Sequence, residues 1–280
     1  MAIPILRMWR RYFLEDRNEG LGSSYERVLL NRKLQELIQR YQIRSALEVP
    51  IFGFTGLSGI NSMWLANNGI EVHLVDNNEA RIDLIRKVWD EINLRVNLLY
   101  QVTFETLPFA SKSVDFSWNY SALWFVGNLQ EFARELTRVV KRAIMFCVPN
   151  RSGFGYLSQK YFSGSDLREE IREDFIIPRN IIACMNACGW TLIESDYIDC
   201  PPWPDIGMAR DEFLRKLGLS MLSKKKRSRT PFYSILNYYS GRQEDFDERM
   251  MKFSWFERRA PKFIKFFWAH HKYLIFEPKK

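Results

Sequence analysis

Short hydrophobic runs alternate with longer amphipathic stretches through the middle of the chain. Short apolar runs are typical of strands whose two faces are both covered, and amphipathic stretches are typical of surface helices. The pattern therefore predicts a series of strands separated by helices. The expected strands are residues 45–49, 72–76, 96–102, 114–118, 142–148, 191–197 and 273–276.

Helices are expected in the intervals between these strands. Ser23 and Glu26 have the spacing of a capping box, which predicts that a helix with one buried face begins there. Strands that alternate with helices in this way indicate a doubly wound α/β sheet. Further helices are expected at residues 60–68, 79–94, 129–140 and 178–188.

The order of these elements predicts a core with additions at either end. If the last strand is antiparallel, it begins at the edge where the parallel strands end, which is where ligands bind in such sheets. His270 and His271 would start that strand, and the segment before it would cover the pocket. The predicted divisions are a helical strap at 1–44, a core at 45–204, a helical lid at 205–268 and a last strand at 269–280.

A glycine-rich turn follows the first strand, and a carboxylate closes the second. Gly53, Gly56 and Gly59 allow the backbone to approach a ligand closely, and Asp76 can accept hydrogen bonds from both hydroxyls of a ribose. The unit is typical of nucleotide binding. A nicotinamide dehydrogenase is disfavoured, because its G-x-G-x-x-G spacing and a hydride-transfer constellation are both missing.

Two more stretches complete a resemblance to a known family. Residues 103–109, Thr-Phe-Glu-Thr-Leu-Pro-Phe, precede Ser-Val-Asp-Phe at 113–116. Together with the glycine turn and Asp76, they resemble the class I S-adenosylmethionine-dependent methyltransferases, in the group that includes ubiquinone-biosynthesis and other small-molecule enzymes. The resemblance covers residues 25–197 and the last strand. It implies a seven-stranded Rossmann-like sheet with a reversed last strand and S-adenosyl-L-methionine as cofactor.

The resemblance also implies roles for individual residues. Glu48 and the turn glycines would surround the methionine end of the cofactor, and Asp76 would hold the ribose. Thr103 stands where the family usually has an acid for the adenine, so the adenine contact would lack charge assistance. The cofactor-binding residues expected are Glu48, Gly53, Gly56, Gly59, Asp76, Asn77, Thr103, Phe104 and Asn119.

Catalytic groups are expected beside the acceptor. The sulfonium methyl is already activated, so the enzyme has mainly to align a nucleophile and exclude water. An oxygen acceptor would also need its proton removed, and His270 or His271 is the predicted general base. Tyr120 and Trp124 are the alternative residues of the pocket wall, with a core role equally open to them.

The net charge of +8 is concentrated in the C-terminal part of the chain. Residues 224–229 form a basic run, and Phe263, Ile264 and Phe267 lie near one helical face that Pro261 interrupts. A lid with solvated lysines, an anionic membrane surface with a lipid-like acceptor, and RNA are three readings of this segment. We favour a small-molecule or lipid-like acceptor. An RNA-directed enzyme and a non-catalytic cofactor-binding scaffold are the alternatives.

Cysteine, histidine and hydropathy patterns exclude several other classes. The four cysteines lack the paired spacing of a metal site, only three histidines exist, and we expect no bound metal. No signal peptide is recognisable, so reduced thiols in a cytoplasmic protein are expected. No apolar run reaches the roughly 18 to 20 residues of a membrane-spanning helix.

Overall fold

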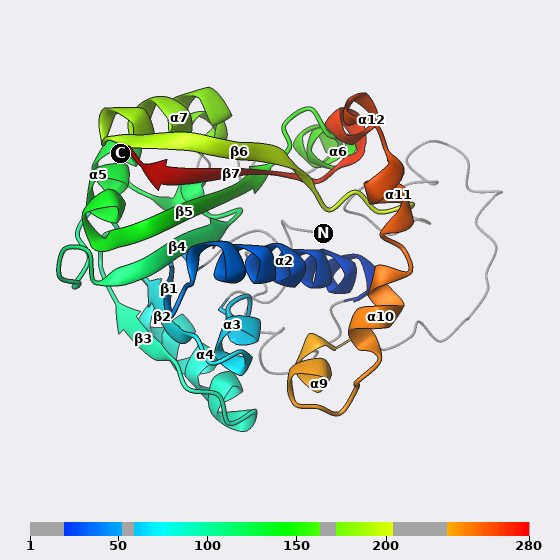
Figure 1. The fold of residues 1–280 in the computed structure, drawn as a ribbon, viewed down its shortest axis with the longest axis horizontal. Helices are drawn as coiled ribbons and strands as arrows, with labels where there is room; N and C mark the ends of the chain where they lie inside the picture. Colours follow the sequence, from blue (N-terminus) through cyan, green and yellow to red (C-terminus); the bar gives the residue numbers. More distant parts are fainter. Residues whose placement is uncertain (1–19, 52–58, 163–171, 204–233, 280) are drawn as a thin grey trace.

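The computed structural model describes residues 20–51, 59–162, 172–203 and 234–279. A seven-stranded sheet in the order β3-β2-β1-β4-β5-β7-β6 forms its centre (Figure 1). All strand pairs are parallel except those of β7, which is antiparallel to β5 and β6. The predicted sheet with its reversed last strand is confirmed. The strands are β1 (Ser45–Glu48), β2 (Glu71–Asp76), β3 (Asn97–Tyr100), β4 (Val114–Tyr120), β5 (Val140–Pro149), β6 (Trp190–Ile198) and β7 (His271–Pro278).

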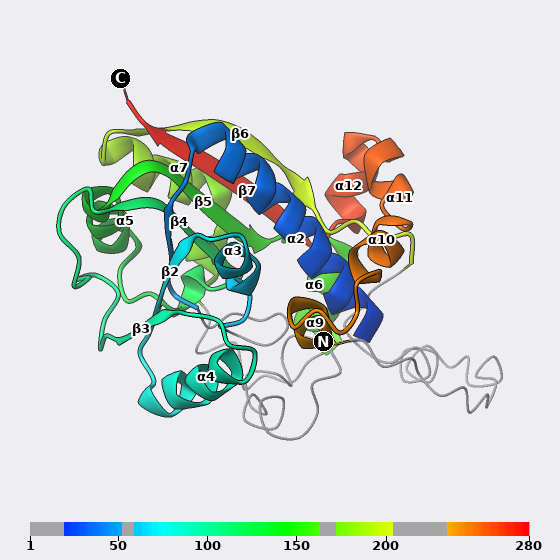
Figure 2. The ribbon, with the colours of Figure 1, turned by 60° about the horizontal axis from the view of Figure 1, so that its bottom comes forward.

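Helices cover both faces of the sheet because successive strand residues point to opposite sides. Ala46 and Met145 contribute to one core with helices α2 (Gly20–Tyr41), α3 (Met63–Asn67) and α4 (Glu79–Glu91). Their strand neighbours Leu47 and Ile144 contribute to the other, with α5 (Leu129–Val139) and α7 (Pro178–Ala187). The molecule therefore has three layers (Figure 2).

Short helices gather near the carboxyl ends of the parallel strands. Tyr239, Phe246 and Met250 of the predicted lid join the core on the α2 side, whereas α11 and α12 contain no buried residue. The helical stretch is interrupted at Pro261, as predicted. The remaining elements are η1 (Leu123–Phe125), α6 (Phe154–Phe162), η3 (Glu173–Ile176), α9 (Ile235–Tyr239), α10 (Phe246–Met251), α11 (Trp255–Arg259) and α12 (Lys262–Trp268).

Three sequence-based expectations are wrong in detail. Helix α2 begins at Gly20, so Ser23 and Glu26 lie inside it and form no capping box. Strand β3 is at the sheet edge and partly exposed, with Tyr100 45% exposed, so its apolar residues do not mark a doubly covered strand. Strand β4 extends two residues beyond the expected end, because parallel pairing with β5 continues through Asn119 and Tyr120.

No helix in the described ranges is long and apolar enough to cross a membrane. Several residues of the sequence analysis, namely Gly53, Gly56 and the basic run at 224–229, lie outside the described residues.

Candidate functional site

Polar side chains from four strands meet at the carboxyl edge of the parallel sheet. Glu48 ends β1, Asp76 ends β2, and Asn119 and Tyr120 end β4. His271 begins the antiparallel β7 and therefore lies at the same edge, opposite Pro149 of β5. This convergence of polar groups at the switch in strand order is the usual location of a ligand site in an open α/β sheet.

Glu48 lies in a buried cluster of polar groups. Its two carboxylate oxygens accept hydrogen bonds from Asn61 Nδ2 at 3.0 Å and Ser62 Oγ at 2.6 Å. The guanidinium of Arg27, on α2, donates in turn to Asn61 Oδ1. Burial raises the pKa of Glu48 to about 7, although these hydrogen bonds and Arg27 oppose the shift. Glu48 is therefore poised to ionise when a cation arrives.

Asp76 is engaged by a neighbouring arginine. Arg81 Nε donates to Oδ2 at 2.8 Å, and another guanidinium nitrogen donates to Oδ1 at 2.6 Å. The backbone N–H of Asn78 also donates to Oδ1, at 2.9 Å. Since each carboxylate oxygen has two acceptor positions, only Oδ2 keeps room for one more donor. A ribose that used both oxygens would have to displace one of these bonds.

Asn119 is a buried amide with an unused acceptor. Its Nδ2 donates to the Val49 carbonyl at 3.2 Å, while its Oδ1 is buried and has no hydrogen-bond partner among the described residues. A buried carbonyl oxygen without a donor is costly, so this atom suits a ligand that brings an N–H or O–H group.

The other predicted cofactor contacts lie in different surroundings. Asn77 is exposed, and its Oδ1 accepts from Arg81 at 3.2 Å. Thr103 is also exposed, whereas Phe104 is packed in the core beside α5. Gly59 has a φ of +80°, and an added Cβ would lie 2.6 Å from Ile85 Cδ1, so its role as seen here is close packing.

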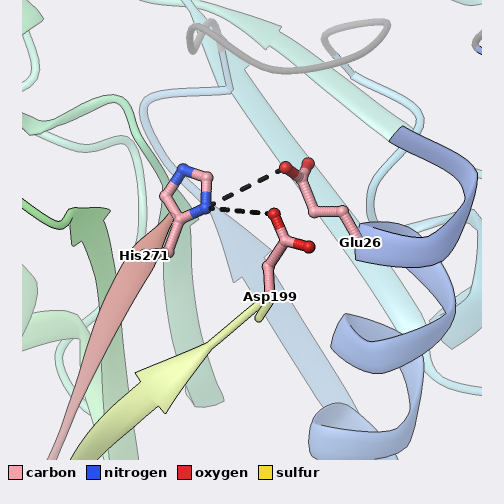
Figure 3. Close-up of side chains that lie close together, drawn as sticks. All are labelled: Glu26, Asp199 and His271. Carbon is pink, nitrogen blue, oxygen red and sulfur yellow. Dashed lines mark ion pairs between the residues drawn. The ribbon is translucent and has the colours of Figure 1, made fainter. Parts of the chain in front are cut away.

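The predicted catalytic residues form one buried network. The hydroxyl of Tyr120 lies 2.8 Å from His271 Nδ1, and His270 Nδ1 lies 2.6 Å from Asp199 Oδ2. His271 Nδ1 also faces the carboxylates of Glu26 and Asp199, which come from α2 and from the end of β6 (Figure 3). Trp124, the other wall candidate, is buried in the core beside α5.

A further carboxylate lies beside this network. Glu257 of α11 accepts hydrogen bonds from Tyr25 Oη at 3.1 Å and from the Cys200 amide at 3.0 Å. Burial raises its pKa to about 7, and the nearby charge of Asp199 acts in the same direction. The candidate site therefore has two parts. One is the Glu48 cluster at the end of β1, and the other is the histidine–carboxylate cluster where β6 ends and β7 begins.

Sequence reasoning identified the strand-end residues and missed their partners. Asn61 and Ser62 directly follow the glycine turn, and Arg81 lies one turn into the helix after Asp76, so their positions offered a local signal. Nothing in the sequence places the other residues together, because they belong to distant segments. The residues missed in this way are Glu26, Arg27, Asp199 and Glu257.

Comparison with known proteins shows a related domain and the same fold. Residues 54–147 match the model of a methyltransferase domain family. A search of curated proteins found no sequence match. An S-adenosylmethionine-dependent methyltransferase from Thermotoga maritima, for which histamine methylation has been suggested, is 13% identical with a TM-score of 0.52, covering 99% of this chain and 97% of that chain.

Two further solved structures share the fold. An S-adenosylmethionine-dependent methyltransferase from Archaeoglobus fulgidus is 15% identical with a TM-score of 0.51, covering 90% of this chain and 94% of that one. The [4+2]-cyclase SpnF is 13% identical with a TM-score of 0.50, covering 89% of this chain and 80% of that chain. Identities this low show a common architecture, and the cyclase shows that this architecture also occurs with another reaction.

Replacing Arg81 with methionine leaves the buried Asp76 carboxylate without its cation. We expect the free energy of unfolding to fall by about 3 kcal/mol, and a second change, Asp76→Asn, to recover part of the loss. As a control, Arg134→Met breaks the exposed Arg134–Glu131 pair and should change stability by less than about 0.5 kcal/mol. Urea denaturation measures the free energy of unfolding of each variant. Equal losses in Arg81→Met and Arg134→Met would contradict the assignment of Arg81 as the partner of Asp76.

Proposed function

We propose that this chain, whose residues 54–147 match a methyltransferase domain family, binds S-adenosylmethionine at its sheet edge and methylates a small-molecule or lipid-like acceptor. The observation that carries the proposal is the buried Glu48 cluster at the end of β1. S-adenosylmethionine carries its transferable methyl group on a positively charged sulfonium, and its methionine end also carries an ammonium group. A buried acid whose pKa is about 7 suits such a cation.

The residues present fit the methionine end of the cofactor. Glu48 would face the ammonium group, and the orphaned Oδ1 of Asn119 would accept from the same group. Asn61, Ser62 and Arg27 fix the Glu48 carboxylate, so that it is oriented before the ligand arrives. Pre-oriented groups lose little entropy on binding, which favours affinity.

Asp76 would bind the ribose, with Arg81 holding its carboxylate in place. One acceptor position on Oδ2 is open to a hydroxyl, and a second contact requires Arg81 or the Asn78 amide to yield. Asn77 and Thr103, both exposed beside the same strand ends, would lie along the adenine. Phe104 would support them from the core.

The acceptor would lie over the ends of β4 and β5. Tyr120 would line its wall, and His270 and His271 remain the predicted proton-handling groups. The main task of these residues is to align the acceptor with the methyl group and to exclude water. The burial of Tyr120 and His271 supports a dry site, because both are less than 8% exposed.

An aromatic patch beside this edge supports a lipid-like acceptor. Phe154 of α6 and Phe263, Phe266 and Phe267 of α12 are 54%, 65%, 40% and 49% exposed. The two helices lie side by side (Figure 1), and the Phe154 and Phe267 rings are 6.2 Å apart. Basic residues flank the patch at Arg258, Arg259, Lys262 and Lys265. Exposed aromatic rings among basic side chains favour the surface of an anionic membrane.

Transfer of a labelled methyl group tests the activity and the acceptor class together. The protein is incubated with methyl-labelled S-adenosylmethionine and a cell extract, which is then separated into lipid, small-molecule, RNA and protein fractions. We expect label in the lipid or small-molecule fraction, and Asp76→Asn should reduce it at least thirtyfold. Label in RNA would favour the RNA-directed alternative, and cofactor binding without transfer would favour a scaffold.

The affinity for S-adenosylmethionine should depend on the ionisation of Glu48. With a pKa of about 7, affinity should rise roughly fivefold to tenfold between pH 6 and pH 7.5. Glu48→Gln should weaken binding and remove this dependence, as measured by calorimetry. Without ligand the sign is opposite: the raised pKa favours the protonated folded state, so stability falls as pH rises from about 4.5 to about 7. A pH-independent affinity in the unaltered protein would contradict the contact.

Vesicle sedimentation tests the aromatic patch. The double change Phe263→Ser with Phe267→Ser removes exposed apolar area and should reduce retention on anionic vesicles at least fivefold. Val102→Ser is the matched control, because Val102 is 70% exposed just beyond β3, at the opposite edge of the sheet. Equal retention of all three proteins would exclude the patch as a membrane contact.

A further inference from the structure

Three buried side chains from distant parts of the chain point at one another where β6 ends and β7 begins. They are Glu26 of α2, Asp199 just after β6, and His271 at the start of β7 (Figure 3). One possible ligand atom from each lies within 4.8 Å of those from the other two. His271 Nδ1 is 3.9 Å from Glu26 Oε2 and 4.0 Å from Asp199 Oδ2.

These separations suit donors that share an ion. They are too long for hydrogen bonds, which require about 2.7–3.2 Å. Metal–nitrogen and metal–oxygen bonds of about 2.0–2.2 Å place two donors of one ion about 3–4 Å apart. Small side-chain adjustments would therefore bring all three atoms onto a single cation.

The charges around the cluster favour a cation. Glu26, Asp199 and His271 are 8%, 2% and 4% exposed, and two carboxylates at this depth repel each other. Glu257 lies close to Asp199 and adds a third carboxyl group beside the cluster. A cation between Glu26 and Asp199 would offset the repulsion of the two carboxylates.

Basic side chains surround the cluster. Arg27 of α2 donates to Asn61, and Lys265 of α12 acts on Glu257 and Cys200. His270 contacts Asp199 Oδ2 at 2.6 Å. A histidine bonded to a carboxylate is a common second layer around a metal ligand, because it fixes the orientation of the carboxylate.

His271 directs its Nδ1 toward both carboxylates, at 3.9 Å from Glu26 and 4.0 Å from Asp199. The hydroxyl of Tyr120, 2.8 Å from Nδ1, lies next to the same position.

We propose that Glu26, Asp199 and His271 form a binding site for a divalent transition-metal ion. One imidazole nitrogen and two carboxylate oxygens make a donor set suited to Mn²⁺ or Zn²⁺. Tyr120, a water molecule or an acceptor oxygen would complete the coordination. The site uses none of the groups assigned to the methionine or ribose of the cofactor, but it shares His271 and Tyr120 with the proposed acceptor pocket. Metal binding is therefore measured without cofactor or acceptor.

Direct metal binding tests the site. The full-length protein is stripped with a chelator and titrated with MnCl₂ and, separately, ZnCl₂ by calorimetry, with the paramagnetic resonance of Mn²⁺ as a second signal. We expect one ion per chain and an increase in melting temperature on metal addition. Mn²⁺ is the more selective probe, because thiolates favour Zn²⁺ and the chain has four cysteines.

Two isosteric variants and one neighbouring control locate the ion. Glu26→Gln and Asp199→Asn should each weaken binding at least thirtyfold. Asp199 has a φ of +64°, a conformation that asparagine also adopts readily, so Asp199→Asn should still fold. Glu257→Gln removes a nearby acid that is not a proposed ligand, and should change affinity less than threefold. Binding of neither ion, or unchanged affinity in both ligand variants, would overturn the proposal.

Discussion

The structure depends on helix α2, which packs on one face of the sheet and brings buried polar side chains to its carboxyl edge. Tyr25, Val28 and Leu34 of this helix are fully buried, so its apolar face fixes its position over the strands. That packing also buries Glu26 and Arg27, and Arg27 acts on Glu48. A buried charge is tolerated only with compensating partners, so each acid at this edge has specific neighbours.

The partners differ along the edge in a way that suits two tasks. Asp76 is balanced by Arg81 through a two-pronged ion pair, which fixes the carboxylate geometrically. Glu48 instead receives mainly neutral donors, and its pKa rises to about 7. One acid is thus held in place by a permanent cation, and the other would be ready for the cation of the proposed ligand.

The fold was predictable from the sequence because it depends on local patterns. Short apolar runs and helical periodicity gave the alternation of strands and helices. The family resemblance, carried by the glycine turn, Asp76 and residues 103–116, implied the reversed β7. The exposure of β3 was not predictable, since the same apolar run suits an edge or a central position. The strand-end acids were identified because they directly follow strands, which is a property of neighbouring residues.

The partners of those acids could not be predicted in the same way. Arg81 is near Asp76 in sequence, but only the helix geometry shows that its guanidinium reaches back. The association of residues 26, 199 and 271 depends on tertiary packing alone, and the search for metal-ligand spacing in the sequence could not find it. Spacing motifs detect ligands on one loop or helix, whereas these ligands come from three separate elements.

Successive residues of α2 connect the two parts of the site. The Glu26 side chain faces His271, and the next side chain, Arg27, donates to Asn61 in the Glu48 cluster. Neighbouring helix positions point about 100° apart, so one turn of one helix can contact both parts. A small rotation of α2 would therefore change the surroundings of Glu48 and of His271 together. The proposed cofactor end and the proposed acceptor end of this edge share a single structural support, and a ligand that orders either part would stabilise the helix position needed by the other.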